Sequence, residues 1–216
     1  YYYPRTSLVC VENTHNRAGG RIFPQNDVVA ICNRAHARGL KVHLDGARIW
    51  NASIATGIDV AKLAEKFDTV SVCFSKGLGA PVGSALCGPK KLVEIEAFRL
   101  RKMWGGGMRQ IGILAAAAMH ALTHHRARLA DDHANAKLLA ELVGKTRGVS
   151  VVPVETNIVN IDVPILGEKI SEMAKTAGVL ISATGPNRLR AVTHLDVSKS
   201  DIERAAEILC SVIERA

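Results

Sequence analysis

Residues 69–79 read Thr-Val-Ser-Val-Cys-Phe-Ser-Lys-Gly-Leu-Gly, a β-branched run that ends in a lysine set among small residues. Branched side chains in a short apolar run are typical of a buried strand. We therefore expect a strand over Thr69–Phe74, with Lys76 just beyond its end. A lone lysine after a strand is most simply a solvated loop charge, so the surrounding sequence decides whether Lys76 has a chemical role.

The sequence around this strand repeats a strand–helix pattern. Two more strands are predicted at Ser7–Glu12 and Lys41–Asp45, with one helix capped by Asn26 between them and a second at Ile58–Phe67. Such alternation predicts an α/β sheet of parallel strands with right-handed crossovers. A further strand is expected at Ser84–Cys87. Helices are expected over residues 89–103 and 108–143, the second with a bend.

After Gly144 the pattern changes to short strands that are not separated regularly by helices. Strands are predicted at Val149–Val154, Asn157–Val163, Val179–Ser182 and Leu189–Thr193, with helices at Glu168–Thr176 and Asp201–Arg215. This is an α+β pattern. The predicted fold class is therefore α/β, with a mostly parallel sheet domain over residues 1–144 followed by a small α+β domain over residues 145–216.

Composition limits the class of protein. Of the 216 residues, 48% are hydrophobic and 22% are charged, as in an average soluble globular chain. We expect no membrane span, because no apolar run is long enough, and no secretion leader is evident. The five cysteines are scattered without a Cys-x-x-Cys pair, which disfavours disulfides and zinc and predicts a cytoplasmic protein. His120 and His124 share a helix face but lack a third ligand, so no metal is expected.

The net charge of +8 has two interpretations. It could indicate a protein that binds polyanions such as nucleic acid. However, the lysines and arginines are dispersed and only 4% of residues are aromatic, so no basic run alternates with stacking rings. We therefore expect a small anionic ligand and no nucleic acid, or an acidic part of the protein outside this chain.

Polar clusters follow each of the first three predicted strands, at residues 12–16, 45–48 and 75–79. Ligands of open α/β sheets bind beyond the carboxyl ends of the strands, so these clusters are expected to converge. Asp45 and Lys76 together suit pyridoxal phosphate (PLP), which needs a lysine for its Schiff base and a carboxylate for its pyridinium nitrogen. The residues alone leave open a capping aspartate and a solvated lysine.

Five motifs occur in the same order as in the threonine aldolases. They are Glu12-Asn-Thr-His-Asn16, His43-Leu-Asp-Gly-Ala-Arg48, Ser75-Lys-Gly-Leu-Gly-Ala-Pro-Val-Gly83, Gly105-Gly-Gly-Met-Arg-Gln110 and Arg190-Ala-Val-Thr-His194. The third is highly specific, whereas related PLP folds share the aspartate of the second. Over essentially its whole length the chain thus resembles the low-specificity L-threonine aldolase family, which implies the aspartate aminotransferase-like fold of fold-type I PLP enzymes.

The resemblance implies a role for six residues. Lys76 would bind PLP covalently and act as the catalytic residue, and Asp45 would pair with the pyridinium nitrogen. Arg48 and Arg190 would bind the substrate carboxylate, with Arg48 also near the cofactor. Lys102 and Arg109 resemble basic residues that lie near the cofactor across a subunit interface. Without the family, surface or interdomain ion pairs would explain the arginines equally well.

The resemblance also implies an activity and partners. The expected reaction is PLP-dependent retro-aldol cleavage of L-threonine or L-allo-threonine to glycine and acetaldehyde by a homo-oligomer, either a dimer or a homotetramer. The alternatives are another fold-type I PLP enzyme, either a β-eliminating lyase or an aminotransferase, and a non-catalytic fragment. No residue here matches the family's loop for the cofactor phosphate. We therefore expect an N-terminal segment of the same enzyme, preceding Tyr1, to complete the site.

Overall fold

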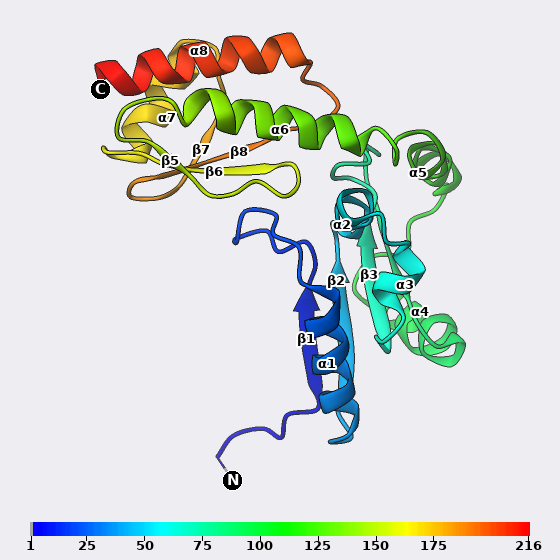
Figure 1. Ribbon diagram of the computed structural model, residues 1–216. Coiled ribbons are helices and arrows are strands. Elements are labelled where there is room, and N and C mark those ends of the chain that lie inside the picture. The colour runs from blue at the N-terminus through cyan, green and yellow to red at the C-terminus, as the bar shows by residue number, and fades with distance from the viewer. Residues whose placement is uncertain (1) are drawn as a thin grey trace. The chain divides into compact units, whose positions relative to one another are not determined.

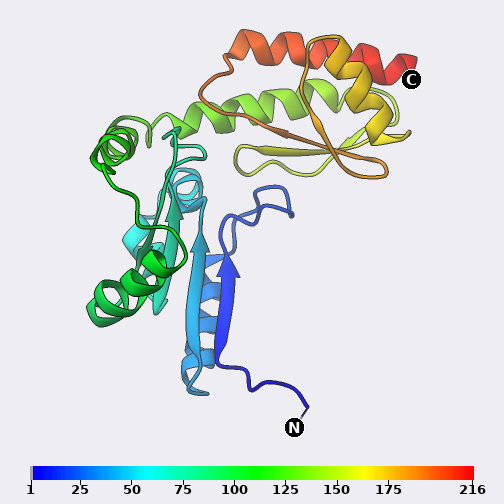
Figure 2. The same ribbon diagram turned by 180° about the vertical axis from the view of Figure 1, so that it is seen from behind.

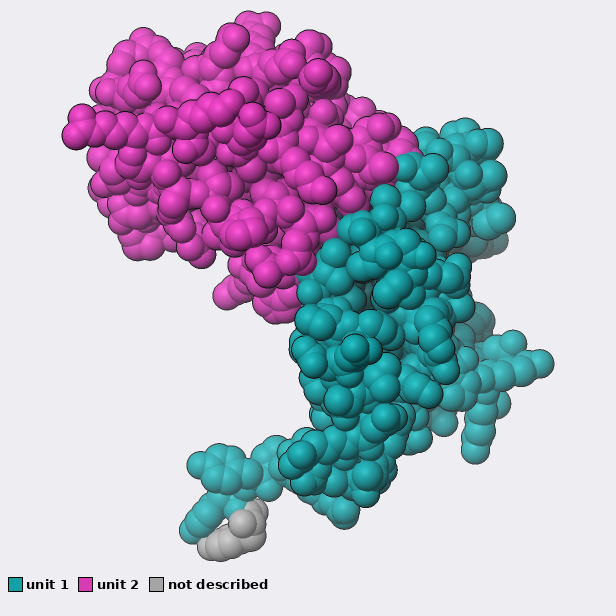
Figure 3. Space-filling model, in the orientation of Figure 1, with its two compact units in different colours: residues 1–14, 22–127 teal, residues 15–21, 128–216 magenta. Residues whose placement is uncertain are grey.

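The computed structural model describes residues 2–216, which form two compact units (Figures 1 and 3). The first unit contains the residues up to 14 and residues 22–127. The second unit contains residues 15–21 and 128–216. Within the described residues, no helix has both the length and the apolar character that a membrane crossing requires.

The sheet of the first unit has four strands in the order β1-β2-β3-β4. Their bounds are Leu8–Glu12 for β1, Lys41–Gly46 for β2, Thr69–Cys73 for β3 and Ser84–Cys87 for β4. The strands β1, β2 and β3 are parallel, and β4 is an antiparallel edge strand. The predicted, mostly parallel sheet is therefore confirmed.

Three helices cover one face of this sheet: α1 (Gln25–His36), α2 (Ile49–Thr56) and α3 (Val60–Ala64). Val42 of β2 packs with residues of α1, and Leu44 packs with residues of α2 and α3. Side chains alternate between the two faces of a strand, so Lys41, His43 and Asp45 lie on the opposite face. Figures 1 and 2 show the three helices on the same side of the strands.

The observed helix bounds differ from the predicted ones in two places. Helix α1 begins after Pro24, which occupies the N-cap position without a side-chain hydrogen bond, so the predicted cap at Asn26 is wrong. Pro24 has φ −56° and ψ 126°, the non-helical backbone of an N-cap residue, and the fixed φ of proline is compatible with it. The helix α2 was not predicted, and the helix expected from Ile58 begins only after Asp59, whose carboxylate accepts a hydrogen bond from the Ala61 N–H.

After β4 the first unit is largely helical, as the sequence predicted. A π-helical turn at Leu92–Ala97 continues into α4 (Phe98–Met103), and α5 spans Gly112–His124. The predicted bend in the long helical stretch lies at residues 125–128, before α6 (Leu129–Val143) of the second unit.

The second unit is an antiparallel sheet in the order β5-β6-β8-β7. The strands are β5 (Ser150–Val151), β6 (Ile158–Asp162), β7 (Ser182–Gly185) and β8 (Arg188–Val192), and the helices are α6, α7 (Gly167–Thr176) and α8 (Lys199–Arg215). Val159, Ile161 and Leu189 point from the sheet into the core, which the helices close. Asn160 and Arg190 therefore lie on the other face of the sheet.

One expectation for this part of the chain was inaccurate. The strand expected at Val179–Ser182 lies at Ser182–Gly185, because only from Ser182 onward does the chain pair with β8. The two compact units divide at residues 127 and 128, whereas the division of the sequence into domains at residues 144 and 145 stays a prediction. Helix α6 packs through Ala136, Leu139 and Val143 into the core of the second unit, so its burial outweighs its sequence continuity with α5.

Histidine 133 on α6 makes the stability of the second unit depend on pH. Only 6% of its surface is exposed, and burial, followed by the charge of Lys137, lowers its pKa to about 4. An unfolded histidine titrates near about pH 6.5, so between these values only the unfolded chain takes up this proton. The free energy of unfolding therefore keeps its full value, as far as this histidine is concerned, above about pH 6.5. It falls by up to about 3 kcal/mol as the pH approaches 4.

Urea unfolding of the wild-type chain and of His133→Gln, at about pH 7.5 and about pH 4.5, checks this expectation. The wild type should lose more stability than the variant over this interval, because glutamine has no proton to bind. Carboxylates whose pKa is lowered, such as Asp162, contribute equally to both proteins. Equal losses in the two proteins would contradict a role for His133.

Candidate active site

The carboxyl ends of the three parallel strands meet at one edge of the first sheet. Glu12 at the end of β1 is the direct partner of Asp45 on β2, and Asp45 is in turn the partner of Ser71 on β3. Lys76 follows three residues after Cys73, the last residue of β3. The fold thus brings the polar residues that follow adjacent strands to one place, as the spacing along the chain predicted.

Asp45 offers a carboxylate oxygen to a ligand at this edge. Its side chain is exposed, and its Oδ1 accepts a hydrogen bond from the Ala47 N–H at 3.0 Å. Its second oxygen makes no hydrogen bond with the described residues. The N-cap of α2 is Arg48, so Asp45 does not cap that helix. A carboxylate with a spare oxygen can accept a hydrogen bond from a protonated ring nitrogen.

Lys76 lies in the loop over residues 74–83, which is stabilised by backbone hydrogen bonds between its own residues. The Phe74 N–H donates to the Gly83 carbonyl at 2.9 Å, the Ala80 N–H to the Phe74 carbonyl at 3.0 Å, and the Gly79 N–H to the Lys76 carbonyl at 2.8 Å. Gly79 has a φ of 73°, in the left-handed region that favours glycine. The lysine is exposed, and its ammonium forms no ion pair with residues 2–216. It is therefore open to a ligand.

The other basic residues predicted from sequence in the first unit occupy different places. Arg48 is half-buried at the start of α2, three residues after Asp45. Lys102 lies in the last turn of α4, where its stem covers Gly107, since a Cβ on that glycine would lie 2.6 Å from Lys102 Cδ. Arg109 follows the glycines and is exposed. No hydrogen bond or ion pair of the described residues joins Lys102 or Arg109 to Asp45 or Lys76.

Arg190 lies in a polar pocket of the second unit. The pocket has a volume of about 520 Å³ and is lined by Asn16, Arg17, Asn160, Thr184, Arg188 and Arg190. The Arg188 guanidinium is neutralised by Asp162, through bonds of 2.6 Å from Nε and 2.8 Å from Nη2. Arg190 has no such carboxylate, and its buried Nε makes no hydrogen bond within the described chain. Arg190 is half-buried, and a guanidinium that lines a polar pocket without a carboxylate beside it is available to bind an anion.

Asn160 is a residue of this pocket that sequence reasoning missed. It is the direct partner of Arg190 in the β6–β8 pair, and only 4% of its surface is exposed. Its Oδ1 is buried and makes no hydrogen bond in the described part of the chain. The sequence held one signal: an asparagine between the core residues Val159 and Ile161. Only the structure reveals that this face is covered.

The cover is the loop over residues 15–21. Its Gly20 carbonyl accepts a hydrogen bond from Thr156 Oγ1 at 2.7 Å, and Arg21 Nε pairs with Glu155 Oε1 at 2.7 Å. Gly19 has a φ of 89°, and a Cβ there would lie 2.9 Å from Asn160 Nδ2. The loop can therefore approach Asn160 this closely only because glycine occupies this position.

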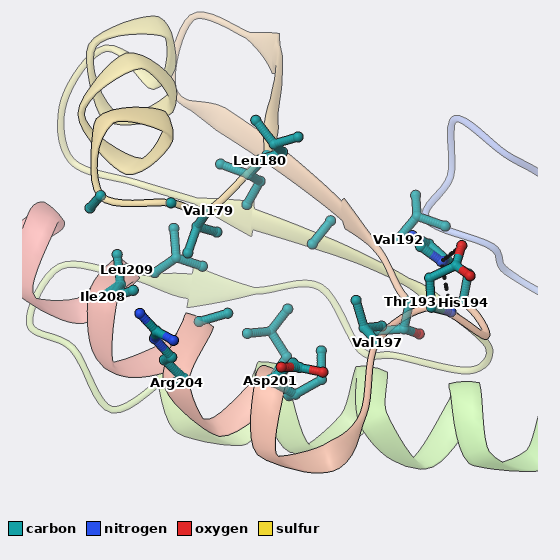
Figure 4. A pocket seen from close by; sticks show the side chains of 18 residues that line it. Val179, Leu180, Val192, Thr193, His194, Val197, Asp201, Arg204, Ile208 and Leu209 are labelled. Carbon is teal, nitrogen blue, oxygen red and sulfur yellow. Dashed lines mark hydrogen bonds and ion pairs between the residues drawn. The ribbon is translucent and has the colours of Figure 1, made fainter.

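A second cavity in the same unit, of about 510 Å³, has a different character (Figure 4). Its walls are largely apolar, with Val179, Ile181 and Leu209 among them. Of its two acidic residues, Asp201 is engaged in the capping box of α8 and Asp196 pairs with His194 at 3.3 Å. In residues 2–216 no group of three or more His, Cys, Asp or Glu side chains is placed to hold a metal ion. The reactive groups therefore concentrate at the Lys76 edge and in the Arg190 pocket.

Comparison with known proteins identifies the family. The family model described as beta-eliminating lyase matches residues 1–165. The chain belongs to the beta-eliminating lyase family. Among the curated relatives of this chain is a probable low-specificity L-threonine aldolase 2 of Arabidopsis thaliana. It is 43% identical over a match that covers 94% of this chain and 58% of its own length. A low specificity L-threonine aldolase of Escherichia coli K12 is 41% identical over 95% of this chain and 60% of its own length.

Solved structures support the fold. A putative L-allo-threonine aldolase of Listeria monocytogenes aligns with all of this chain and 62% of its own, with a TM-score of 0.81 and 23% identity. A threonine aldolase of Leishmania major aligns with a TM-score of 0.78 and 19% identity, over 96% of this chain and 61% of its own. The predicted resemblance to low-specificity threonine aldolases and the predicted fold are both confirmed. The chain spans about 60% of the length of these relatives.

Proposed function

We propose that the protein is a PLP-dependent aldehyde-lyase that cleaves L-threonine or L-allo-threonine into glycine and acetaldehyde. The observation that carries this proposal is the presence of two chemical groups at one edge of the sheet. The spare carboxylate oxygen of Asp45 lies near the end of β2, and the exposed amine of Lys76 follows the adjacent parallel strand β3. An amine and a carboxylate are the two groups that PLP requires from a protein. The names of the curated relatives support the same reaction.

Each predicted residue then has a task. Lys76 would hold the cofactor by a covalent bond from its amine, and Asp45 would accept a hydrogen bond from the protonated ring nitrogen. The bound cofactor supplies an electron sink that stabilises negative charge on the substrate α-carbon. Arg48 would lie beside the cofactor and the substrate carboxylate. Lys102 and Arg109 would add positive charge near the cofactor across a subunit interface.

Arg190 would bind the substrate carboxylate. A guanidinium presents two parallel N–H groups that match the two oxygens of a carboxylate. The lack of an anionic partner for Arg190, beside the fully paired Arg188, supports this choice between the two arginines. Gripping the carboxylate at two points fixes the orientation of the amino acid, which is how binding energy is used for positioning.

Further parts of the proposal concern the whole protein. We propose that it acts in the cytoplasm as a homo-oligomer, a dimer or a tetramer, and that an N-terminal segment of the same enzyme completes the cofactor site. The chain covers 58% of the Arabidopsis relative, so a longer protein would have room for this segment. The division into a domain over residues 1–144 and one over 145–216 remains our proposal for its organisation in sequence.

The products of the reaction distinguish this function from its nearest alternative. The family description favours β-elimination as the second candidate. The intact protein, supplied with PLP and L-threonine, should release acetaldehyde and glycine in equal amounts, with L-allo-threonine as a parallel substrate. Elimination would instead release ammonia and 2-oxobutanoate. Stoichiometric ammonia without glycine would overturn the aldolase proposal, and no product of either kind would favour a non-catalytic fragment.

A further inference from the structure

Two neighbouring residues, His125 and Arg126, stabilise the chain on either side of Lys76, in and beside the lysine loop (residues 74–83). His125 directly follows α5, and its Nδ1 lies 2.7 Å from the carbonyl oxygen of Leu78, two residues after Lys76. A carbonyl can only accept, so Nδ1 carries the hydrogen and donates it. Leu78 is 1% exposed, so this bond satisfies a carbonyl in a buried part of the loop.

The second contact acts on the chain before Lys76. Trp50 of α2 donates from Nε1 to the carbonyl of Cys73, the last residue of β3, at 3.3 Å. The Arg126 guanidinium carbon lies 5.2 Å from the centre of the Trp50 ring, a cation–π contact. Arg126 therefore steadies the indole that binds the strand end, while His125 binds the loop directly.

The His125 ring is itself supported. It meets the His120 ring edge-on, with ring centres 5.3 Å apart. His124, the preceding residue, also stacks on His120, at 4.4 Å, but forms no hydrogen bond with the lysine loop. The two adjacent histidines thus share a neighbour and differ in the bond to Leu78, which makes His124 a matched control.

We propose that His125 and Arg126 are positioning residues that fix the loop over residues 74–83. They would thereby orient the Lys76 amine toward the cofactor site before the cofactor binds. The proposal rests on the proposed function, in which Lys76 holds PLP. The loop has three backbone bonds of its own. Anchors at Cys73 and Leu78, one on each side of Lys76, limit the rotation of the segment that carries the amine. Preorganisation of this kind lowers the cost of binding.

The first test needs no cofactor. Hydrogen exchange of the intact protein, measured on peptides that span residues 74–83, compares the wild type with His125→Phe and His124→Phe. Phenylalanine keeps a ring but cannot donate to Leu78. In His125→Phe the Gly79 and Ala80 amides should exchange about tenfold faster, the change expected for one lost hydrogen bond. Amides of α1 and β2 should be unaffected, and His124→Phe should match the wild type.

The second test measures the amine itself. After addition of PLP and borohydride, the rate at which Lys76 acquires a reduced adduct should fall about tenfold in His125→Phe. His125→Gln, whose amide can donate to the same carbonyl, should restore most of the rate. Arg126→Ala provides a second variant if His125→Phe does not fold, with faster exchange expected first at Phe74, next to Cys73.

The outcomes separate this proposal from the function on which it rests. Unchanged exchange of the loop in His125→Phe and Arg126→Ala would overturn it, whatever the cofactor result. Faster exchange with an unchanged rate of adduct formation would also overturn it, because the contacts would then serve only stability. If wild-type Lys76 formed no adduct at all, the proposed function would fail, and the exchange data alone would decide whether the contacts order the loop.

Discussion

Lys76→Ala is expected to abolish the covalent bond to PLP and to reduce cleavage of threonine on the order of 10⁴-fold or more, the loss seen when a nucleophile is removed. Alanine has no amine to react with the cofactor aldehyde. The intact mass after borohydride reduction measures the bond, and release of acetaldehyde measures the turnover. The wild type should gain one reduced PLP, located on the peptide that contains Lys76, whereas the variant should gain none.

Two further variants test whether the reactive amine of Lys76, and not its positive charge, is required. Lys76→Arg keeps a positive charge at the strand end but offers no reactive amine, so it should fail as completely as alanine. Lys90→Ala removes an exposed lysine that pairs with Glu94 at 3.7 Å, and it should keep the adduct and the activity. An adduct that mapped to another lysine, or normal turnover by Lys76→Ala, would remove the basis of the proposed function.

Arg190→Ala is expected to raise KM for threonine about 100-fold, the effect of losing a charged hydrogen-bonded contact with the substrate. The folded protein should not be destabilised, because Arg190 forms no ion pair with residues 2–216 and its Nε makes no hydrogen bond with them, so the substitution breaks neither. Thermal unfolding and steady-state kinetics test the two halves of this expectation. Arg190→Lys should fall between the wild type and alanine, since an ammonium binds a carboxylate without the bidentate geometry.

Arg147, which is exposed in the same unit, provides the control. Arg147→Ala changes the net charge by the same amount, so it reports any general electrostatic effect on an anionic substrate. An equal rise in KM for Arg147→Ala and Arg190→Ala would contradict a specific carboxylate site. A large fall in melting temperature for Arg190→Ala would instead favour a structural role for this arginine.

The parts of the fold that the sequence predicted are those that depend on local pattern. Strands β1, β2 and β3 were predicted because short β-branched runs recur between helical segments. The helix cap at Asn26 was predicted wrongly, because proline and asparagine both suit a helix start and the pattern does not choose between them. The sequence pattern also does not show that α6 packs through Ala136, Leu139 and Val143 into the core of the second unit, a contact that only the tertiary structure reveals.

For the site, the sequence by itself determined the residues at the Lys76 edge. Parallel strands end at the same edge of a sheet, so Asp45 and Lys76 could be brought together from their positions after two strands. Tertiary structure alone decided the burial of Asn160, the missing anion partner of Arg190 and the bond from His125 to Leu78. These features arise from contacts between residues far apart in the chain, and neither periodicity nor local propensity carries information about such contacts.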